Sequence, residues 1–338
     1  MTTGTKVFRI IISVLLALCI LSAAFFFFAV YYFDQIVIQQ EDYGIFVAGI
    51  SVTRENEDDI LGDGTVFYDP DSRTLVFANA KIETEYSVLV SKIDLGICLL
   101  GENKFIASGD RYPVFISAAD FYNAKDIYIY GDGSLTIEYL NPRTDSAVLQ
   151  CDNLTLLSDI TITTPDCTNL SNGIVCDSSL KMLNGATVTV NGSPAKSLMA
   201  FRVRGNAFLD VGTTINVTVE KGSTDAAKGV IVSGDLIIGE GASVNVSMAE
   251  DSAKVVECIR VTGLLEVGGD ATVTASSAKS HAIESYGAIK FSEDAIVSAT
   301  SEDGSADILC YGAVTDYGAA VSGEIKALGQ CYDMFEKS

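Results

Sequence analysis

The sequence predicts an all-β fold, a right-handed parallel β-helix (a solenoid), preceded by one N-terminal transmembrane helix. Three observations lead to this prediction: a period-two alternation of apolar and polar residues, its recurrence along the chain, and one long uncharged apolar segment. The alternation indicates strands with one buried face and one face in water. Its recurrence indicates units that stack on one another, because a single coil buries too little apolar surface alone.

The repeat is anchored by an apolar column that recurs at intervals of roughly 19 to 29 residues. A second apolar residue recurs six positions before most anchors, and glycine recurs two positions before several of them. Phe201 joins the earlier column if Arg204–Gly205 contains a one-residue insertion. After each anchor the alternation continues through a short polar turn into another strand. The anchors are Leu135, Leu154, Leu180, Leu209, Leu236, Leu265, Ile289 and Val314.

An uncharged apolar segment spans residues 10–33 and is long enough to cross a hydrocarbon core of about 30 Å as a helix. Lys6 and Arg9 precede it and Asp34 follows it, so the positive-inside rule places the N-terminus in the cytoplasm. We therefore expect a single-pass protein of the cell membrane with the bulk of the chain extracellular. A cleaved signal peptide, with the small residues at 22–24 as its cleavage site, stays open as the alternative.

These features predict five parts in the chain. A cytoplasmic N-terminus is followed by the transmembrane helix, a stalk, the parallel β-solenoid and a C-terminal tail or cap. A cap is expected because the end of a solenoid exposes unpaired strand edges. The predicted boundaries are 1–9 for the N-terminus, 10–33 for the helix, 34–44 for the stalk, 45–327 for the solenoid and 328–338 for the tail or cap.

Charge and composition argue against some classes of function. The chain contains 22 Lys+Arg against 44 Asp+Glu, a formal net charge of -22, and this field repels nucleic acid. With eight cysteines but no CxxC pair and one histidine, a zinc site is not expected. We interpret most of the cysteines as small buried apolar residues, and a disulfide between Cys167 and Cys176 stays open.

Two motifs resemble those of known surface proteins. The segment 61–70, LGDGTVFYDP, followed by TLVFANA at 74–80, is similar to the first module of β-helix surface proteins of Gram-positive bacteria. The segment 131–137, GDGSLTI, resembles their repeated coil motif. The resemblance covers roughly residues 45–325 and implies a pectate-lyase-like or carbohydrate-binding β-helix. The chain departs from the polysaccharide-binding relatives because it contains no tryptophan.

Outward tyrosines form the first candidate binding site. Tyr286 and Tyr311 fall in the same outward column on successive coils, and Tyr317 follows shortly after the second. Stacked exposed rings could offer a flat face to a sugar. The structural alternative is an aromatic ladder that stabilises the sheet.

Acidic turn residues form the second candidate site. Asp270 and Asp294 are adjacent in the predicted stack, and Glu293 precedes the second of them. Three carboxyl groups could hold calcium with water completing its shell. Asp is also an ordinary turn residue, so calcium is a tentative ligand. No other cofactor is expected.

A β-helix lyase would need clustered carboxylates for calcium and a nearby free base. The outward charges instead pair with opposite charges: we expect salt bridges between Asp177 and Arg204, and between Arg260 and Glu284, on neighbouring coils. We therefore assign no catalytic residue.

The sequence thus favours a cell-surface binding or structural module over an enzyme, with a cell-surface or environmental polysaccharide as its expected partner. A polysaccharide lyase-like enzyme and an adhesin or surface-assembly protein stay open as alternatives. The sequence does not set the oligomeric state.

Overall fold

The computed structural model describes residues 21–23, 42–108, 116–117, 119–120, 123–140, 146–167, 170–194, 197–220, 225–249, 254–329 and 331–333. The chain divides into two compact units, residues 43–52 with 56–338, and residues 1–42 with 53–55. The predicted transmembrane helix at 10–33 lies outside the described residues except for 21–23, which are helical. No helix in the described part of the chain has the length and apolarity needed to cross a membrane.

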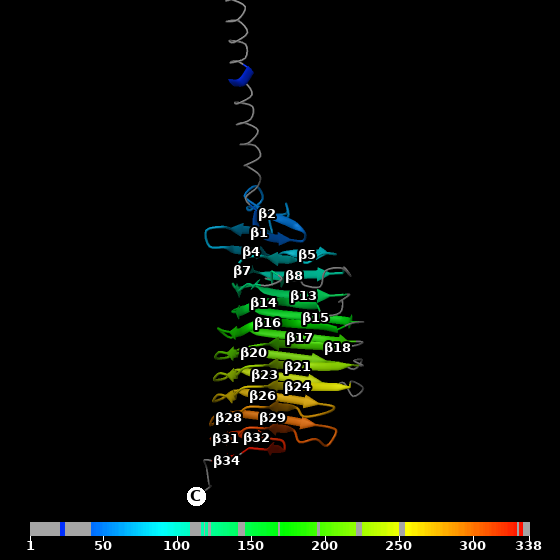
Figure 1. Ribbon diagram of the computed structural model, residues 1–338, viewed down its shortest axis with the longest axis vertical. Helices are drawn as coiled ribbons and strands as arrows, with labels where there is room; N and C mark the ends of the chain where they lie inside the picture. The colour runs from blue at the N-terminus through cyan, green and yellow to red at the C-terminus, as the bar shows by residue number, and fades with distance from the viewer. Residues whose placement is uncertain are drawn as a thin grey trace, which may run out of the picture. The chain divides into compact units, whose positions relative to one another are not determined.

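Residues 43–52 with 56–338 form a parallel β-solenoid, which confirms this part of the predicted fold. Figure 1 shows its coils stacked in chain order, from β4 in blue to β34 in red. A full coil contains a strand on each of three faces, and each strand pairs in parallel with its equivalents in the coils before and after. The long strands β14 and β16 turn the corner between the first and second faces without interruption.

The first face begins at β6 and ends at β33. Its strands are β6 (Leu89–Ser91), β9 (Ile116–Ser117), the first parts of β14 (Ser146–Leu156) and β16 (Leu170–Met182), β18 (Ser197–Val203), β21 (Ala226–Val232), β24 (Val255–Val261), β27 (Ile283–Ser285), β30 (Ile308–Cys310) and β33 (Ile325–Ala327).

The second face begins at β4 and ends at β34. Its strands are β4 (Thr74–Ala78), β7 (Leu95–Leu100), β12 (Ile127–Tyr130), the last parts of β14 and β16, β19 (Ala207–Leu209), β22 (Leu236–Ile238), β25 (Leu265–Val267), β28 (Ile289–Phe291), β31 (Val314–Asp316) and β34 (Cys331–Asp333).

The third face is a separate sheet that begins at β5. Its strands are β5 (Lys81–Thr84), β8 (Glu102–Ala107), β13 (Ser134–Tyr139), β15 (Asp159–Cys167), β17 (Thr187–Pro194), β20 (Thr214–Val219), β23 (Ser243–Met248), β26 (Thr272–Ser277), β29 (Ile296–Ser301) and β32 (Ala320–Ser322).

Antiparallel strands precede the parallel coils. β1 (Asp42–Val47) pairs antiparallel with β6, and β3 (Val66–Asp69) pairs antiparallel with β4. β2 (Ile50–Thr53) is separated from β1 by a tight turn in which Ala48 and Gly49 both have positive φ. A small antiparallel pair, β10 (Ala119–Asp120) with β11 (Asn123–Ala124), also branches from the coils. At the N-terminal end, β1 and β3 therefore cover strand edges that would otherwise be unpaired.

The interior contains continuous apolar ladders, as the alternation predicts. On the first face Ile174, Phe201, Val230, Ile259 and Ile283 follow one another in register, and all are buried. Identical or similar side chains therefore pack on one another from coil to coil. Each coil depends on its neighbours for most of its buried surface.

Two of the predicted anchors are wrong, because the strand register places other residues at the anchor position. Leu135 lies on the third face beside Ile160, and Ile127 is the residue equivalent to Leu154. Leu209 pairs with Met182, so that Ala207 takes the anchor position beside Leu180. Leu209 is displaced by two residues, a slip that keeps the same face buried, so alternation alone does not detect it.

The second correction also removes an expected irregularity. With Ala207 as the anchor, Phe201 stands six positions earlier, as its equivalents do in other coils. Arg204–Gly205 therefore needs no inserted residue.

Candidate functional site

The two predicted tyrosines on neighbouring coils do stack. The ring centroids of Tyr286 and Tyr311 lie 4.8 Å apart with an interplanar angle of 5°. The residues lie at the corner that follows β27 and β30, where they are 47% and 42% exposed. Each ring therefore covers one face of the other, and the stack supports the sheet as an aromatic ladder does.

The third predicted tyrosine stands apart from this stack. Tyr317 follows β31, so the whole of that strand separates it from Tyr311. Among the described residues, no ring contact joins Tyr317 to another aromatic side chain. Tyr286 has a raised pKa, caused by burial first and then by the neighbouring Glu284 carboxylate. The three tyrosines do not form one platform.

The predicted calcium residues lie in turns between the second and third faces. Asp270 and Asp294 have φ values of 53° and 64°, the left-handed conformation that Asp tolerates better than most residues. Glu293 is exposed beside Asp294. Within the described ranges, no three His, Cys, Asp or Glu side chains form a group that could hold a metal ion. Turn geometry thus accounts for Asp270 and Asp294, and calcium at this place stays a prediction.

One of the two predicted salt bridges is formed as expected. Arg204 Nη1 lies 2.9 Å from Asp177 Oδ1, between neighbouring coils. Arg260 is in register with Glu284, but its Nη1 lies 2.8 Å from Glu257 on its own strand. Lys228 Nζ also contacts Glu257 at 2.9 Å, so this carboxylate forms ion pairs with both Arg260 and Lys228.

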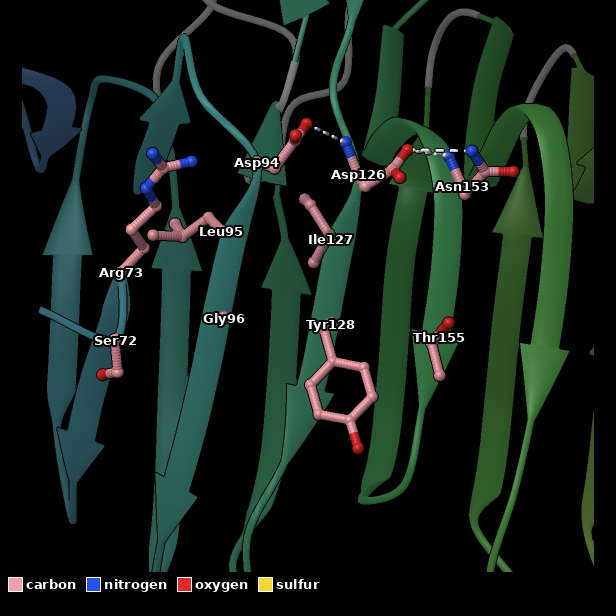
Figure 2. Close-up of a pocket in the computed structure, with 10 residues that line it drawn as sticks. All are labelled: Ser72, Arg73, Asp94, Leu95, Gly96, Asp126, Ile127, Tyr128, Asn153 and Thr155. Carbon is pink, nitrogen blue, oxygen red and sulfur yellow. Dashed lines mark hydrogen bonds between the residues drawn. The ribbon is translucent and has the colours of Figure 1, made fainter.

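The sequence did not predict the groove that the structure forms on the second face. It has a volume of about 350 Å³ and lies between the start of β4 and the last part of β14 (Figure 2). Four successive coils contribute to it. The lining residues are Ser72, Arg73, Asp94, Leu95, Gly96, Asp126, Ile127, Tyr128, Asn153 and Thr155.

Gly96 has no side chain and so leaves room for neighbouring side chains at the base of the groove. Gly96 lies in register between Thr74 and Tyr128 on the outward column. A Cβ at this position would lie 3.0 Å from Thr74 Oγ1 and 3.6 Å from Tyr130 Cε1. The hydroxyls of Thr74 and Tyr130 are 3.2 Å apart and hydrogen-bond across the space that the glycine leaves.

Tyr128 supplies the aromatic surface of the groove. The residue is 42% exposed, and its ring packs against Tyr130 with centroids 5.2 Å apart and an angle of 44°. Figure 2 shows this ring face-on, beside Gly96 and Thr155. Tyr128 is as exposed as Tyr311, and unlike Tyr311 it lines this groove.

Three polar side chains form one rim, and we call Asp94, Asp126 and Asn153 the Asx ladder. Asp94 Oδ1 accepts the backbone N–H of Asp126 at 3.0 Å. Asp126 Oδ1 accepts the backbone N–H of Asn153 at 3.2 Å and its Nδ2 at 2.9 Å. Asn153 Oδ1 accepts the hydroxyl of Ser179 at 2.6 Å. These bonds fix the orientation of the rim, and the dashed lines in Figure 2 mark those among Asp94, Asp126 and Asn153.

The remaining charged side chain, Arg73, lies at the turn before β4, at the same edge of the sheet as the Asx ladder and one coil before Asp94 (Figure 2). Its residue has a φ of 53°, in the left-handed region, at the turn before β4. The groove therefore combines a half-exposed aromatic ring with carboxylate, amide and guanidinium groups. Polar groups that converge around an apolar surface are typical of small-molecule sites.

One sequence signal for this groove was present. Asp or Asn recurs immediately before the second-face strand in several coils, and the alternation in Ile127–Tyr130 places two tyrosines on the outer side. Only the register shows that Arg73 and Asn153 line one groove, because they are far apart in the chain.

Comparison with protein-family models, curated proteins and solved structures finds no match to this chain.

Proposed function

We propose that this protein is a membrane-anchored extracellular module that binds carbohydrate in the groove around Tyr128. The observation that supports this most is the half-exposed ring of Tyr128, in a groove that Asp126, Asn153 and Arg73 also line. An apolar sugar face can stack on such a ring while hydroxyls bond to the rim. The volume of about 350 Å³ is at the lower end for small-molecule sites, which suits a short stretch of glycan.

The charge of the groove favours a neutral or amino sugar over an acidic one. Asp94 and Asp126 both lie on the rim, and the chain has a formal net charge of -22. An anionic sugar would be repelled by this field, whereas a hydroxyl or an ammonium group can donate to the carboxylates. Arg73, which lines the same groove, can donate to a ring or hydroxyl oxygen of the sugar.

The transmembrane helix and the right-handed sense of the coil belong to the same proposal. The uncharged segment at 10–33, with Lys6 and Arg9 before it, supports a single-pass helix with an extracellular solenoid. The right-handed sense of the coil is supported by the strong preference of parallel strand connections for that hand. The resemblance to pectate-lyase-like and carbohydrate-binding surface proteins supports the same reading.

A polysaccharide lyase is the second candidate. The observation in its favour is that Arg73 shares one groove with Asp94 and Asp126, since such enzymes use a base beside carboxylates. In this groove, however, the Oδ1 atoms of both carboxylates already accept backbone N–H groups. We therefore rank binding above cleavage.

The test is a glycan array with the full chain in mild detergent, with and without EDTA. A Tyr128→Ala variant is expected to lose binding by about tenfold, because an aromatic contact contributes roughly 0.5–1.5 kcal/mol beyond its buried area. Tyr311→Ala is a matched control, since Tyr311 is also an outward tyrosine with an exposed fraction of 42%. That variant should bind as the wild type does.

Each result separates the candidates. Loss of binding in Tyr311→Ala but not in Tyr128→Ala would move the site to the aromatic stack. Sensitivity to EDTA would support calcium at Asp270, Glu293 and Asp294. A new unsaturated product from a polyuronate would support the lyase. An array without any bound glycan would reject the proposal and favour an adhesin or structural role.

A further inference from the structure

Two cysteines face each other inside the solenoid. Cys151 on β14 and Cys176 on β16 are direct register partners on neighbouring parallel strands. Both side chains point inward and both residues are 0% exposed. The structure holds them as thiols. The sequence had suggested Cys167 as a partner for Cys176, but Cys167 lies on β15 in register with Pro194.

The geometry of this pair suits a covalent bond. Neighbouring strands lie about 4.8 Å apart, which falls inside the range of Cα separations seen in disulfides, about 4.4–6.8 Å. The two Cβ atoms point to the same side of the sheet, because the residues are direct register partners. Joining the sulfurs therefore requires side-chain rotation and little backbone movement.

The backbone beside the pair can also adjust. The register shifts immediately after it, between Cys151 and Asn153, where β14 and β16 turn the corner. Such an irregularity bends the strand locally and relaxes the ladder. A bridge at the last regular pair would thus introduce little strain.

We infer that Cys151 and Cys176 form a disulfide that links two consecutive coils in their interior. The two thiols lose two protons and two electrons as the S–S bond forms. A small-molecule disulfide, such as oxidised glutathione, or a dithiol oxidase takes the electrons and is reduced to two thiols. The exchange proceeds through a mixed disulfide, from which the second cysteine displaces the reduced thiol.

The order of events follows from burial. The hydrogen bond with Cys176 and the loss of solvent both raise the pKa of Cys151 well above its usual range, so almost no thiolate is present in the folded chain. An oxidant also cannot reach a pair that is fully covered. The bond must therefore form before the two coils close on each other, and the finished bridge is equally protected from reductants.

The disulfide would also fix the relative position of two coils beside the groove. Asn153 follows Cys151 by two residues, and its Oδ1 accepts the hydroxyl of Ser179, which lies beyond Cys176 on the neighbouring coil. A bond between the cysteines fixes these coils at the corner from which the Asx ladder projects. The inference does not depend on carbohydrate binding.

The test refolds the full chain in mild detergent from denaturant, with and without oxidised glutathione, and then alkylates it in denaturant. Oxidative refolding should protect two of the eight cysteines, and a non-reducing peptide map should show the peptides of Cys151 and Cys176 joined. The thermal midpoint should rise by about 5 °C, as expected for a bridge of this loop length. Oxidant added to the folded reduced chain should protect neither cysteine.

Matched variants come from the same inward column. Cys151→Val should fold, because valine occupies this column at Val203, Val232 and Val261, and it should abolish the redox-dependent shift. Cys310→Val, in the same column beside Ser285, should keep that shift. The inference is wrong if Cys151 and Cys176 remain alkylated after oxidative refolding, or if the map joins another pair.

Discussion

The corner between the first and second faces is built differently in the two halves of the solenoid. In the N-terminal coils, side-chain oxygens of one coil accept the backbone N–H of the equivalent residue in the next, as Asp94 does for Asp126 at 3.0 Å. In the C-terminal coils the same position has no side-chain acceptor. From Asp94 onward the position is occupied by Asp94, Asp126, Asn153, Ser179, Asn206, Asp235, Leu264, Ala288 and Ala313.

The main-chain bond at this corner is the same in both halves. The N–H of Leu95 donates to the carbonyl of Asp126 at 3.0 Å, and the N–H of Leu265 donates to that of Ala288 at 2.9 Å. The inward apolar ladder and the main-chain hydrogen bonds therefore maintain the geometry of the coil, and polar side chains at the corner are not needed for it. The corner side chains are available for another role, and the groove lies where they are polar.

The largest expected effect tests whether equivalent buried residues contribute equally to stability in both halves of the solenoid. Leu154 and Leu265 are equivalent inward residues, both at most 1% exposed, one beneath the polar corner and one beneath the apolar corner. Leu154→Ala and Leu265→Ala should each lower the free energy of unfolding by about 2–5 kcal/mol. Urea unfolding followed by circular dichroism measures both, and a cost for one that is several-fold smaller would contradict a common core.

A smaller effect measures what the polar corner adds. Asp126→Ala removes the acceptor of two hydrogen bonds from Asn153, so we expect a loss of about 1–2 kcal/mol. Leu264→Ala, at the equivalent position of a later coil, should cost about 0.5 kcal/mol because this corner is half-buried. The same unfolding assay applies. Equal costs would show that side-chain acceptors do not distinguish the two corners.

The sequence predicted the ladder well because the inward pattern is strictly local. Val230, Ile259 and Ile283 are each followed two positions later by another buried residue, and each is buried in register with the next. The alternation did not identify the anchor where that residue is small, as at Ala207. It also did not distinguish antiparallel from parallel pairing, since β3 alternates in burial in the same way as strands in the coils.

The groove could not be predicted for a different reason. Its members lie on four coils, and whether Arg73 comes near Asn153 depends on the register across every intervening loop. Loop lengths vary between coils, so the period does not fix that register. The Asp177–Arg204 pair was predictable because the two residues lie on adjacent coils of the regular part.

The smallest expected effect concerns a cross-coil bond that the C-terminal half makes outside the corner. Asp303, in the loop between β29 and β30, accepts the backbone N–H of Ser280 from the preceding coil at 2.8 Å. It also accepts the N–H of Ser305 at 2.9 Å. These N–H groups, that of Ser280 first, hold the pKa of Asp303 well below its usual range. An acidic side chain thus joins two coils here through the loop.

The depressed pKa sets the sign of the pH dependence. The stabilisation by Asp303 is fully present above its unfolded-state pKa of about 3.9 and is lost as pH falls through the lower folded-state value. Asp303→Asn should therefore flatten the fall in thermal midpoint below about pH 4, with only a small change at neutral pH because the side chain is exposed. Thermal melts between pH 2 and 7 measure this slope. An unchanged slope would mean that the cross-coil bond to Ser280 contributes nothing to stability, and that the C-terminal coils depend on their inward ladder and main-chain bonds alone.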